Sequence, residues 1–262
     1  MEPFSCRGII LASREFKEKD RLVSVLTSDR GLVTVCAKGS GRPGSKAAFA
    51  AIPFIVCDLV VSVSHGYYYL KEGAIVENNS DIMNSLETMT CASHMASCLL
   101  DSTFQGDMAH EAYELAAYAF YMLDKHPEDY LVIYSAFNWR LLTIAGLTVR
   151  YEVTNNGGEE IAPGNAYLVS LTGGTIETAK NSKAGRLTGT DYRILPFDCI
   201  DALNYFFDCP VNRLFTAKAS AEVLSALKDF TTAYLSVQFD KDYDGLKLLD
   251  DIVRSSSGQG RA

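Results

Sequence analysis

The first eighty residues alternate between apolar and polar positions with a period of two, a pattern typical of half-buried strands. Turn-forming sequences such as Ser28-Asp29-Arg30-Gly31 and His65-Gly66 separate the β-branched segments. The pattern predicts five strands, at residues 5–13, 21–27, 32–38, 54–64 and 67–78. Because no helical pattern lies between the hairpins, we expect these strands to close into a small barrel, which leaves no unpaired edge.

From about residue 81 the apolar positions follow the helical period instead. One apolar face, with Asp107 as a candidate cap, consists of Ala112, Leu115, Ala116, Ala119, Phe120 and Leu123. A helix at 130–147, with Pro127 before it and Gly146 near its end, is apolar almost all round, so we expect it at the centre of a bundle. Further helices are predicted at 198–207, 213–235 and 245–254, before a disordered tail at 255–262.

Residues 150–192 interrupt the helical pattern. Asn155-Asn156-Gly157-Gly158 and Leu171-Thr172-Gly173-Gly174 have turn composition and flank candidate strands at 166–170 and 175–178. We therefore predict an α+β protein of two domains. A β-barrel occupies residues 1–80, and a helical bundle at 81–262 carries an irregular, β-containing insertion at about 150–192.

Charge is distributed unevenly along the chain. The 262 residues carry a net charge of −8, yet residues 1–50 contain nine Lys or Arg against five Asp or Glu, a local charge of +4, which leaves −12 for the rest. Local charge decides whether a polyanion can bind, so nucleic acid is a candidate partner of the barrel. The seven cysteines, an odd number in mostly apolar runs, are expected to be reduced and buried. Without a signal-peptide pattern or a long uncharged apolar run, we predict a cytoplasmic protein with no membrane partner.

Basic residues of the predicted barrel could follow a nucleic-acid backbone across one face. The candidate DNA-binding set is Arg14, Lys17, Lys19, Arg21, Arg30, Lys38, Arg42 and Lys46. The interleaved acids Glu15, Glu18, Asp20 and Asp29 offer a plainer alternative, in which about half of this charge is neutralised and the rest is an ordinary solvated surface.

The glycine-rich loop contains Gly39, Gly41 and Gly44 and nearly matches a P-loop. A P-loop needs Lys directly after the last Gly and then Ser or Thr, whereas Ser45-Lys46 reverses that order. A nucleotide-using enzyme is therefore the least supported class. Contact with a DNA backbone and an ordinary solvated loop are the other interpretations.

Two further clusters contain residue types that could carry chemistry. Tyr67 and Tyr69 share one strand face, so the exposed members could stack on bases, although aromatic side chains on strands more commonly pack in a core. Cys91, His94 and Cys98 could face one way on a helix, but three ligands among apolar neighbours favour a buried face over a metal site. No catalytic motif is evident, so we do not expect an enzyme.

An ordered set of segments resembles the bacterial RecO recombination mediators. The amino-terminal part of the set is Gly8-Ile9-Ile10-Leu11, Arg14-Glu15-Phe16-Lys17-Glu18-Lys19-Asp20-Arg21-Leu22-Val23, Leu26-Thr27, Gly31, Ala37-Lys38-Gly39 and Pro53-Phe54. The helical part is Phe137-Asn138-Trp139-Arg140-Leu141-Leu142 and Ala145-Gly146-Leu147. The resemblance covers most of the chain and is strongest over residues 8–55 and 137–147.

This resemblance implies an amino-terminal OB-fold and a helical domain with a zinc-ribbon-like insertion. It further implies binding of single- and double-stranded DNA, annealing of complementary strands at the nucleoid, and cooperation with RecR and single-strand-binding protein to place RecA on DNA. Relatives bind the acidic carboxyl-terminal tail of single-strand-binding protein in an apolar pocket with a basic rim. By position and charge, the candidate residues for binding that tail are Arg140, Arg150, Arg213 and Lys218. The alternative interpretation is that these are ordinary surface or helix-end charges.

One departure from the family pattern concerns zinc. Many members carry Cys-x-x-Cys-Gly after the Leu-Gly helix end and a second Cys or His pair further on. Here the first pair falls near Thr154-Asn155-Asn156-Gly157-Gly158, and no Cys or His occurs from 127 to 198. We therefore predict no zinc and no other cofactor. The competing function is a non-enzymatic interaction scaffold of the repair machinery whose barrel binds DNA weakly or not at all.

Overall fold

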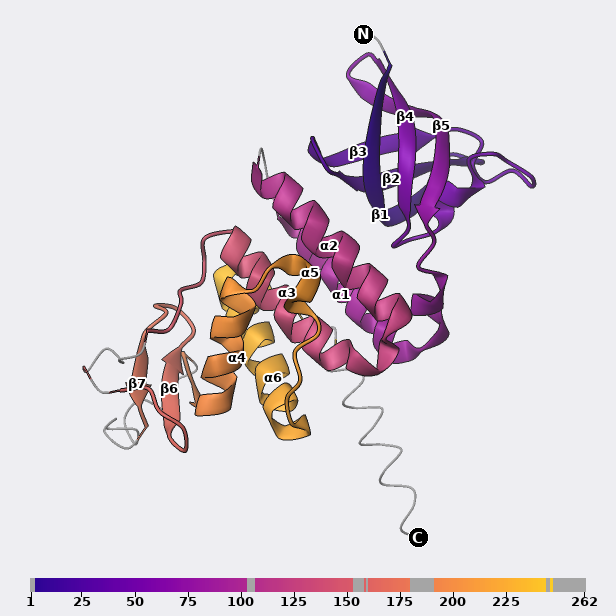
Figure 1. Ribbon diagram of the computed structural model, residues 1–262. Helices are drawn as coiled ribbons and strands as arrows, with labels where there is room; N and C mark the ends of the chain where they lie inside the picture. Colours follow the sequence, from indigo (N-terminus) through magenta and orange to yellow (C-terminus); the bar gives the residue numbers. More distant parts are fainter. Residues whose placement is uncertain are drawn as a thin grey trace. The chain divides into compact units, whose positions relative to one another are not determined.

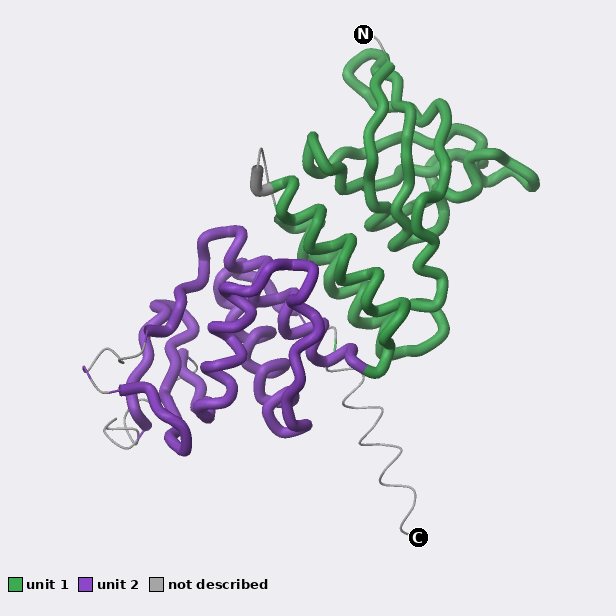
Figure 2. Tube along the Cα trace, in the orientation of Figure 1, with its two compact units in different colours: residues 1–128, 245–262 green, residues 129–244 purple. Residues whose placement is uncertain are grey.

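The computed structural model describes residues 3–102, 107–152, 158, 160–179, 191–243 and 246. The chain divides into two compact units, one containing residues 1–128 and the other residues 129–244 (Figure 2). The five barrel strands and two helices belong to the first unit, and the remaining helices and a small sheet belong to the second.

The first unit begins with a closed five-stranded barrel (Figure 1). Its strands are β1 (Phe4–Phe16), β2 (Asp20–Thr27), β3 (Gly31–Ala37), β4 (Val56–Ser64) and β5 (Tyr67–Glu77). They are ordered β1-β2-β3-β5-β4, antiparallel except for a short parallel pairing between β3 and β5. This is the OB-fold-like architecture expected from the sequence, and all five predicted strands are confirmed.

Alternation along the strands places one face of the sheet inside the barrel. Ile10, Val25 and Val35 point into a core that also holds Cys6 and Cys57. Strand β1 continues three residues beyond its predicted end, because Phe16 still pairs with Asp20 across a tight turn. Lys17 makes this turn possible by adopting a left-handed backbone with φ 56°.

A helical hairpin completes the first unit. Helices α1 (Leu86–Asp101) and α2 (Asp107–Lys125) follow the 3₁₀ turn η2 (Ser80–Asn84), and Ser85 caps α1 by accepting a hydrogen bond from the Thr88 amide. The ring of Phe54, which precedes β4, lies 5.1 Å from that of Phe120 on α2. The Asn79 side chain donates to the Phe54 carbonyl, at 2.8 Å. The ring contact joins the barrel to the hairpin, and the Asn79 bond fixes the connection that leads into it.

The second unit is built around helix α3 (Tyr130–Ile144), which follows the 3₁₀ turn η3 (Pro127–Asp129). Trp139 is fully buried, with its ring centroid 5.2–6.2 Å from those of Tyr151, Phe230 and Tyr234. The prediction of a central helix is confirmed. It ends three residues early, where Gly146 takes up a left-handed φ of 70°.

A small three-stranded sheet lies between α3 and the later helices in the sequence. Its strands β6 (Ala166–Ser170), β7 (Ile176–Thr178) and β8 (Tyr192–Pro196) are ordered β7-β6-β8. The first two confirm the predicted strands of the insertion, whereas β8 was not anticipated. It is a short edge strand that runs directly into α4 at Phe197, so no loop separates it from the helix.

Helices α4 (Phe197–Asp208), α5 (Val211–Leu214) and α6 (Ala221–Gln238) complete the second unit. The predicted continuous helix at 213–235 is wrong in its first turns. The Thr216 hydroxyl donates back to the Arg213 carbonyl, and Ser220 accepts from the Val223 amide as the cap of α6. Both side chains compete with helical backbone bonds, so the chain breaks between α5 and α6.

Four predictions fall partly or wholly outside the described residues. They are the turn at 155–158, the helix at 245–254, the disordered tail at 255–262 and the capping role of the Asp107 side chain. In the described part of the chain, no helix is both long and apolar enough to cross a bilayer.

Candidate nucleic-acid interface

A groove of about 730 Å³ crosses the barrel on the face formed by β2 and β3. The turn between β1 and β2 and the turn between β4 and β5 border it. These are the strands and loops with which OB-folds bind oligonucleotides. The lining residues are Phe16, Lys17, Asp20, Leu22, Leu32, Val33, Thr34, Cys36, Lys38, Gly66, Tyr67, Tyr68 and Tyr69.

Aromatic side chains form one wall of this groove. Tyr67 is 68% exposed, whereas Tyr69 is half-buried beside Lys38, whose Nζ lies 4.5 Å from the ring centroid. Tyr68 points the other way and packs edge-on against Phe4, at 5.8 Å. The alternation assigned to the three tyrosines is therefore confirmed, and Tyr67 presents a free ring face to solvent.

The groove also has an apolar floor that the charge-based prediction missed. Phe16 and Leu32 are both more than a third exposed although neither lies in a turn. In strand β3 the alternation of Leu32, Thr34 and Cys36 along one face was visible in the sequence. Apolar residues on the outer face of a strand are the signal that could have identified this floor.

Two lysines of the candidate set lie in the groove. Lys17 lies in the β1–β2 turn with its Nζ 5.2 Å from the Phe16 ring, and Lys38 directly follows β3. The one carboxylate in the groove, Asp20, accepts a 2.8 Å hydrogen bond from the Gly39 amide. This bond fixes the start of the glycine-rich loop. Asp20 therefore has a structural role, although it lies in the same groove as Lys17 and Lys38.

The other six basic candidates lie outside the groove lining. Arg21 donates to the Ser13 hydroxyl at 2.7 Å, and Arg30 stacks over the Phe4 ring at 4.1 Å while pairing with Asp29. Exposed side chains without an ion pair or hydrogen bond within the described residues are those of Arg14, Lys19, Arg42 and Lys46. The structure thus leaves most of the basic set accessible, but assembles only Lys17 and Lys38 with the tyrosines.

The glycine-rich loop does not form a phosphate-binding P-loop. The Gly41 amide donates to the Lys19 carbonyl and the Arg42 amide to the Gly39 carbonyl, both at 3.1 Å. The loop leads into a 3₁₀ turn, η1 (Ala48–Ala51), and not into an α-helix. In a P-loop the loop leads into an α-helix whose amino terminus faces the phosphate, and no such helix follows this loop.

The partner-binding candidates of the second unit are dispersed. Arg140 is half-buried and donates from Nε to the Phe206 carbonyl, at 2.9 Å, and from its terminal nitrogen to the Cys209 carbonyl. These bonds satisfy carbonyls at the carboxyl end of α4. Arg150 forms an exposed ion pair with Asp208, at 2.7 Å, and the hydrogen bond to Asp208 raises the pKa of Arg150.

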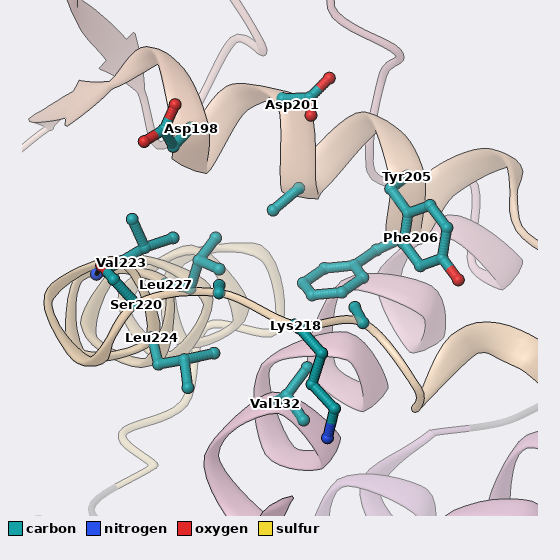
Figure 3. Close-up of a pocket in the computed structure, with 13 residues that line it drawn as sticks. Val132, Asp198, Asp201, Tyr205, Phe206, Lys218, Ser220, Val223, Leu224 and Leu227 are labelled. Carbon is teal, nitrogen blue, oxygen red and sulfur yellow. Dashed lines mark hydrogen bonds between the residues drawn. The ribbon is translucent and has the colours of Figure 1, made fainter.

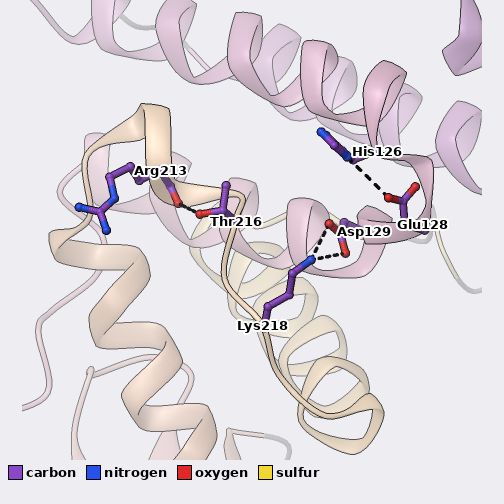
Figure 4. Close-up of polar contacts among 6 residues, drawn as sticks. All are labelled: His126, Glu128, Asp129, Arg213, Thr216 and Lys218. Carbon is purple, nitrogen blue, oxygen red and sulfur yellow. Dashed lines mark hydrogen bonds and ion pairs between the residues drawn. The ribbon is translucent and has the colours of Figure 1, made fainter.

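Arg213 and Lys218 lie in the connection between α4 and α6. Arg213 is exposed, and its carbonyl accepts the Thr216 hydroxyl (Figure 4). Lys218 reaches both carboxylate oxygens of Asp129, at 2.9 and 3.1 Å (Figure 4). Lys218 borders an apolar cavity of about 470 Å³ among α3, α4 and α6.

The cysteine side chains offer no evident reactive centre. All seven are buried, as expected, and none of them forms a disulfide. Burial raises the pKa of Cys57 to about 12 and that of Cys199 to about 11. Cys91, His94 and Cys98 are buried on α1, and within the described residues no group of three or more His, Cys, Asp or Glu side chains could hold a metal.

Comparison with known families decides what this barrel and bundle represent. Residues 1–79 match the family described as "Recombination protein O N terminal", and residues 83–246 match "Recombination protein O C terminal". The chain belongs to the RecO family. The amino-terminal match ends two residues after β5 of the barrel, and the carboxyl-terminal RecO match begins in η2, just before α1.

Curated RecO relatives extend over the whole chain. The DNA repair protein RecO of Acetivibrio thermocellus is 24% identical over 248 residues, covering 94% of this chain and 96% of the relative. The DNA repair protein RecO of Clostridium acetobutylicum is 20% identical over 252 residues, 96% of this chain and 99% of the relative. That of Desulforamulus reducens is 20% identical over 264 residues, covering 99% of each. The resemblance inferred from the ordered segments is thereby confirmed.

Proposed function

We propose that this RecO-family protein is a non-enzymatic DNA repair and recombination mediator that binds single- and double-stranded DNA and anneals complementary single strands. The observation that carries this proposal is the groove of the barrel, where Lys17, Lys38 and the exposed ring of Tyr67 line one surface. Lysines can neutralise phosphates while an aromatic ring stacks on a base, a combination typical of single-strand binding.

Annealing needs no covalent chemistry. Two single strands repel each other through their phosphates, so a protein that carries cations beside both backbones lowers the barrier to pairing. The exposed side chains of Arg14, Lys19, Arg42 and Lys46, outside the groove, are available for a second backbone. We propose that the groove holds one strand and these residues attract the other.

Family membership supports a set of partners for this role. We propose that the protein cooperates with RecR and single-strand-binding protein to load RecA onto coated DNA, and that it works at the nucleoid in the cytoplasm. Arg213 is the best placed of the four tail candidates, because its guanidinium is exposed and has no ion pair within the described residues. Retention of tail affinity after charge reversal of all four candidates would contradict this placement.

A salt series tests the DNA-binding proposal. Anisotropy of a labelled single strand should show log affinity falling with log salt at a slope of roughly −0.7 for each phosphate contacted. A slope near zero would favour the competing function, a protein-interaction scaffold with a barrel that does not bind DNA. That alternative is favoured by the contacts that already engage two barrel candidates, the hydrogen bond of Arg21 to Ser13 and the ion pair of Arg30 with Asp29. An annealing assay with and without single-strand-binding protein then tests mediation.

A further inference from the structure

The pocket of the second unit combines an apolar interior with an acidic edge (Figure 3). Helix α4 forms one wall and α6 another, and the connection before α6 crosses between them. The apolar lining residues are Val132, Ala202, Phe206, Ala217, Ala219, Val223, Leu224 and Leu227. A volume of about 470 Å³ is within the range of roughly 300–1,000 Å³ that is usual for ligand pockets.

The charged groups of this pocket are predominantly negative. Asp198 and Asp201 lie on the α4 wall, are exposed, and form no ion pair or hydrogen bond within the described residues. The single cation of the lining, Lys218, is already held by Asp129 at 2.9 Å. Because Asp129 neutralises Lys218, the net charge of the pocket lining is negative and comes from the two aspartates of α4.

Charge complementarity therefore selects the occupant. An acidic peptide would meet two carboxylates at close range without an unengaged cation in the lining, whereas Lys or Arg side chains would gain two ion pairs at the edge. The apolar interior requires a bulky anchor in the same segment, because buried aromatic or aliphatic anchors provide most of the affinity at such pockets. We propose that this pocket binds a partner-protein segment in which an aromatic or aliphatic anchor is flanked by Lys or Arg.

This inference is independent of DNA binding by the barrel and of the proposed contact of an acidic tail with Arg213. The negative charge at the pocket edge should favour a basic peptide over an acidic one. The test uses the full chain and two labelled peptides with a central Phe, one flanked on each side by two lysines and the other by two glutamates. Fluorescence anisotropy should show binding of the lysine peptide, and replacement of its Phe by Ala should weaken binding roughly tenfold or more.

Variants of the pocket locate the contact. D198N/D201N should weaken binding of the lysine peptide roughly twofold to thirtyfold, since each of the two exposed ion pairs contributes about 0.2–1 kcal/mol. The matched control E152Q/E177Q removes two exposed acids of the same unit that do not line the pocket, and should leave binding unchanged. A202F, which fills the interior, should abolish binding while the melting temperature and DNA affinity stay close to those of the parent.

Three outcomes of the peptide and charge-variant titrations would overturn the proposal. They are tighter binding of the glutamate peptide, equal weakening by the control variant, and absence of saturable binding by the lysine peptide. If A202F does not fold, L224S serves in its place, because Leu224 is a half-buried lining residue whose truncation removes apolar contact without adding volume. Unchanged lysine-peptide binding by a folded A202F or L224S protein would likewise place the contact elsewhere.

Discussion

The ammonium group of Lys38 lies 4.5 Å from the centroid of the Tyr69 ring, so cation and aromatic face are held together in one wall of the barrel groove. Such a contact keeps the Lys38 side chain ordered without neutralising its charge. The charge remains available to a phosphate, and Tyr67, two residues earlier on the same strand face, remains available to a base. This relationship gives the first two predictions.

Removal of the exposed ring should weaken single-strand binding. Tyr67→Ala is expected to lower the affinity for single-stranded DNA by roughly 1–3 kcal/mol, because a stacked base loses its platform. Tyr67→Phe should retain most of the affinity, since the ring face remains. Anisotropy titrations measure both, with Tyr118→Ala, another exposed tyrosine on α2, as the control. Equal losses for Tyr67→Ala and Tyr118→Ala would exclude a specific stack.

Removal of the groove lysines should flatten the salt dependence. K17Q/K38Q is expected to make the slope of log affinity against log salt less negative by about 0.7 for each phosphate that the variant no longer neutralises. The matched control is Lys71→Gln on β5, an exposed lysine of the same barrel that does not line the groove. A slope unchanged in K17Q/K38Q but altered in Lys71→Gln would place the DNA on another face.

Arg140 should behave as a structural residue. Arg140→Met leaves the carbonyls of Phe206 and Cys209 without their donor, and is expected to lower the free energy of unfolding by about 1–3 kcal/mol. DNA affinity should not change. Urea denaturation measures the loss, with Arg213→Met, an exposed arginine, expected within about 0.5 kcal/mol of the parent. Full stability of Arg140→Met together with loss of partner binding would support the partner role instead.

The barrel contains a thiol that should resist alkylation. Burial raises the pKa of Cys57 to about 12, so almost none of it is thiolate at neutral pH and little reagent can reach it. Mass spectrometry after iodoacetamide treatment should find Cys57 unmodified in the folded protein and modified in urea. Raising the pH from 7 to about 9 should not change that result while the barrel stays folded. Rapid modification of Cys57 under native conditions would mean that the barrel opens readily.

An exposed ion pair should give the barrel a small acid-sensitive contribution to stability. Arg7 donates to both carboxylate oxygens of Asp58, at 2.7 and 3.0 Å, and this hydrogen bonding lowers the pKa of Asp58 from its ordinary value of 3.8. A lowered folded-state pKa stabilises the fold above the ordinary value, and the contribution disappears as pH falls through the folded pKa. The difference in melting temperature between parent and Asp58→Asn should therefore shrink below about pH 4. An NMR titration midpoint of Asp58 at or above 3.8 would contradict this.

Periodicity predicted most of the architecture because long alternating or amphipathic segments carry redundant information. The barrel strands and the helix around Trp139 each bury many positions in register, so a single exception does not change the pattern. The break before α6 was missed for the opposite reason. It depends on the Thr216 and Ser220 hydroxyls competing with backbone bonds over a few residues, and a longer apolar pattern masks that local competition.

The candidate interface was only partly predictable. Residue type and local charge identified Lys17, Lys38 and Tyr67, but they could not separate these from Arg21, whose guanidinium is held by Ser13. Which cations have protein partners depends on side-chain geometry across strands, and sequence spacing does not encode it. The apolar floor with Leu32 was missed because a charge pattern carries no information about uncharged side chains.

Phe54, which has a left-handed backbone, packs its ring against Phe120 of α2. This contact limits how far the amino-terminal half can be shortened and still fold without exposing an aromatic side chain. A polypeptide that ends at Glu77 would retain every barrel strand, but its Phe54 ring would be exposed to water. We expect such an exposed apolar side chain to promote self-association. One extended through Lys125 would keep that ring covered. The smallest well-behaved piece of the amino-terminal half is therefore the barrel together with its helical hairpin.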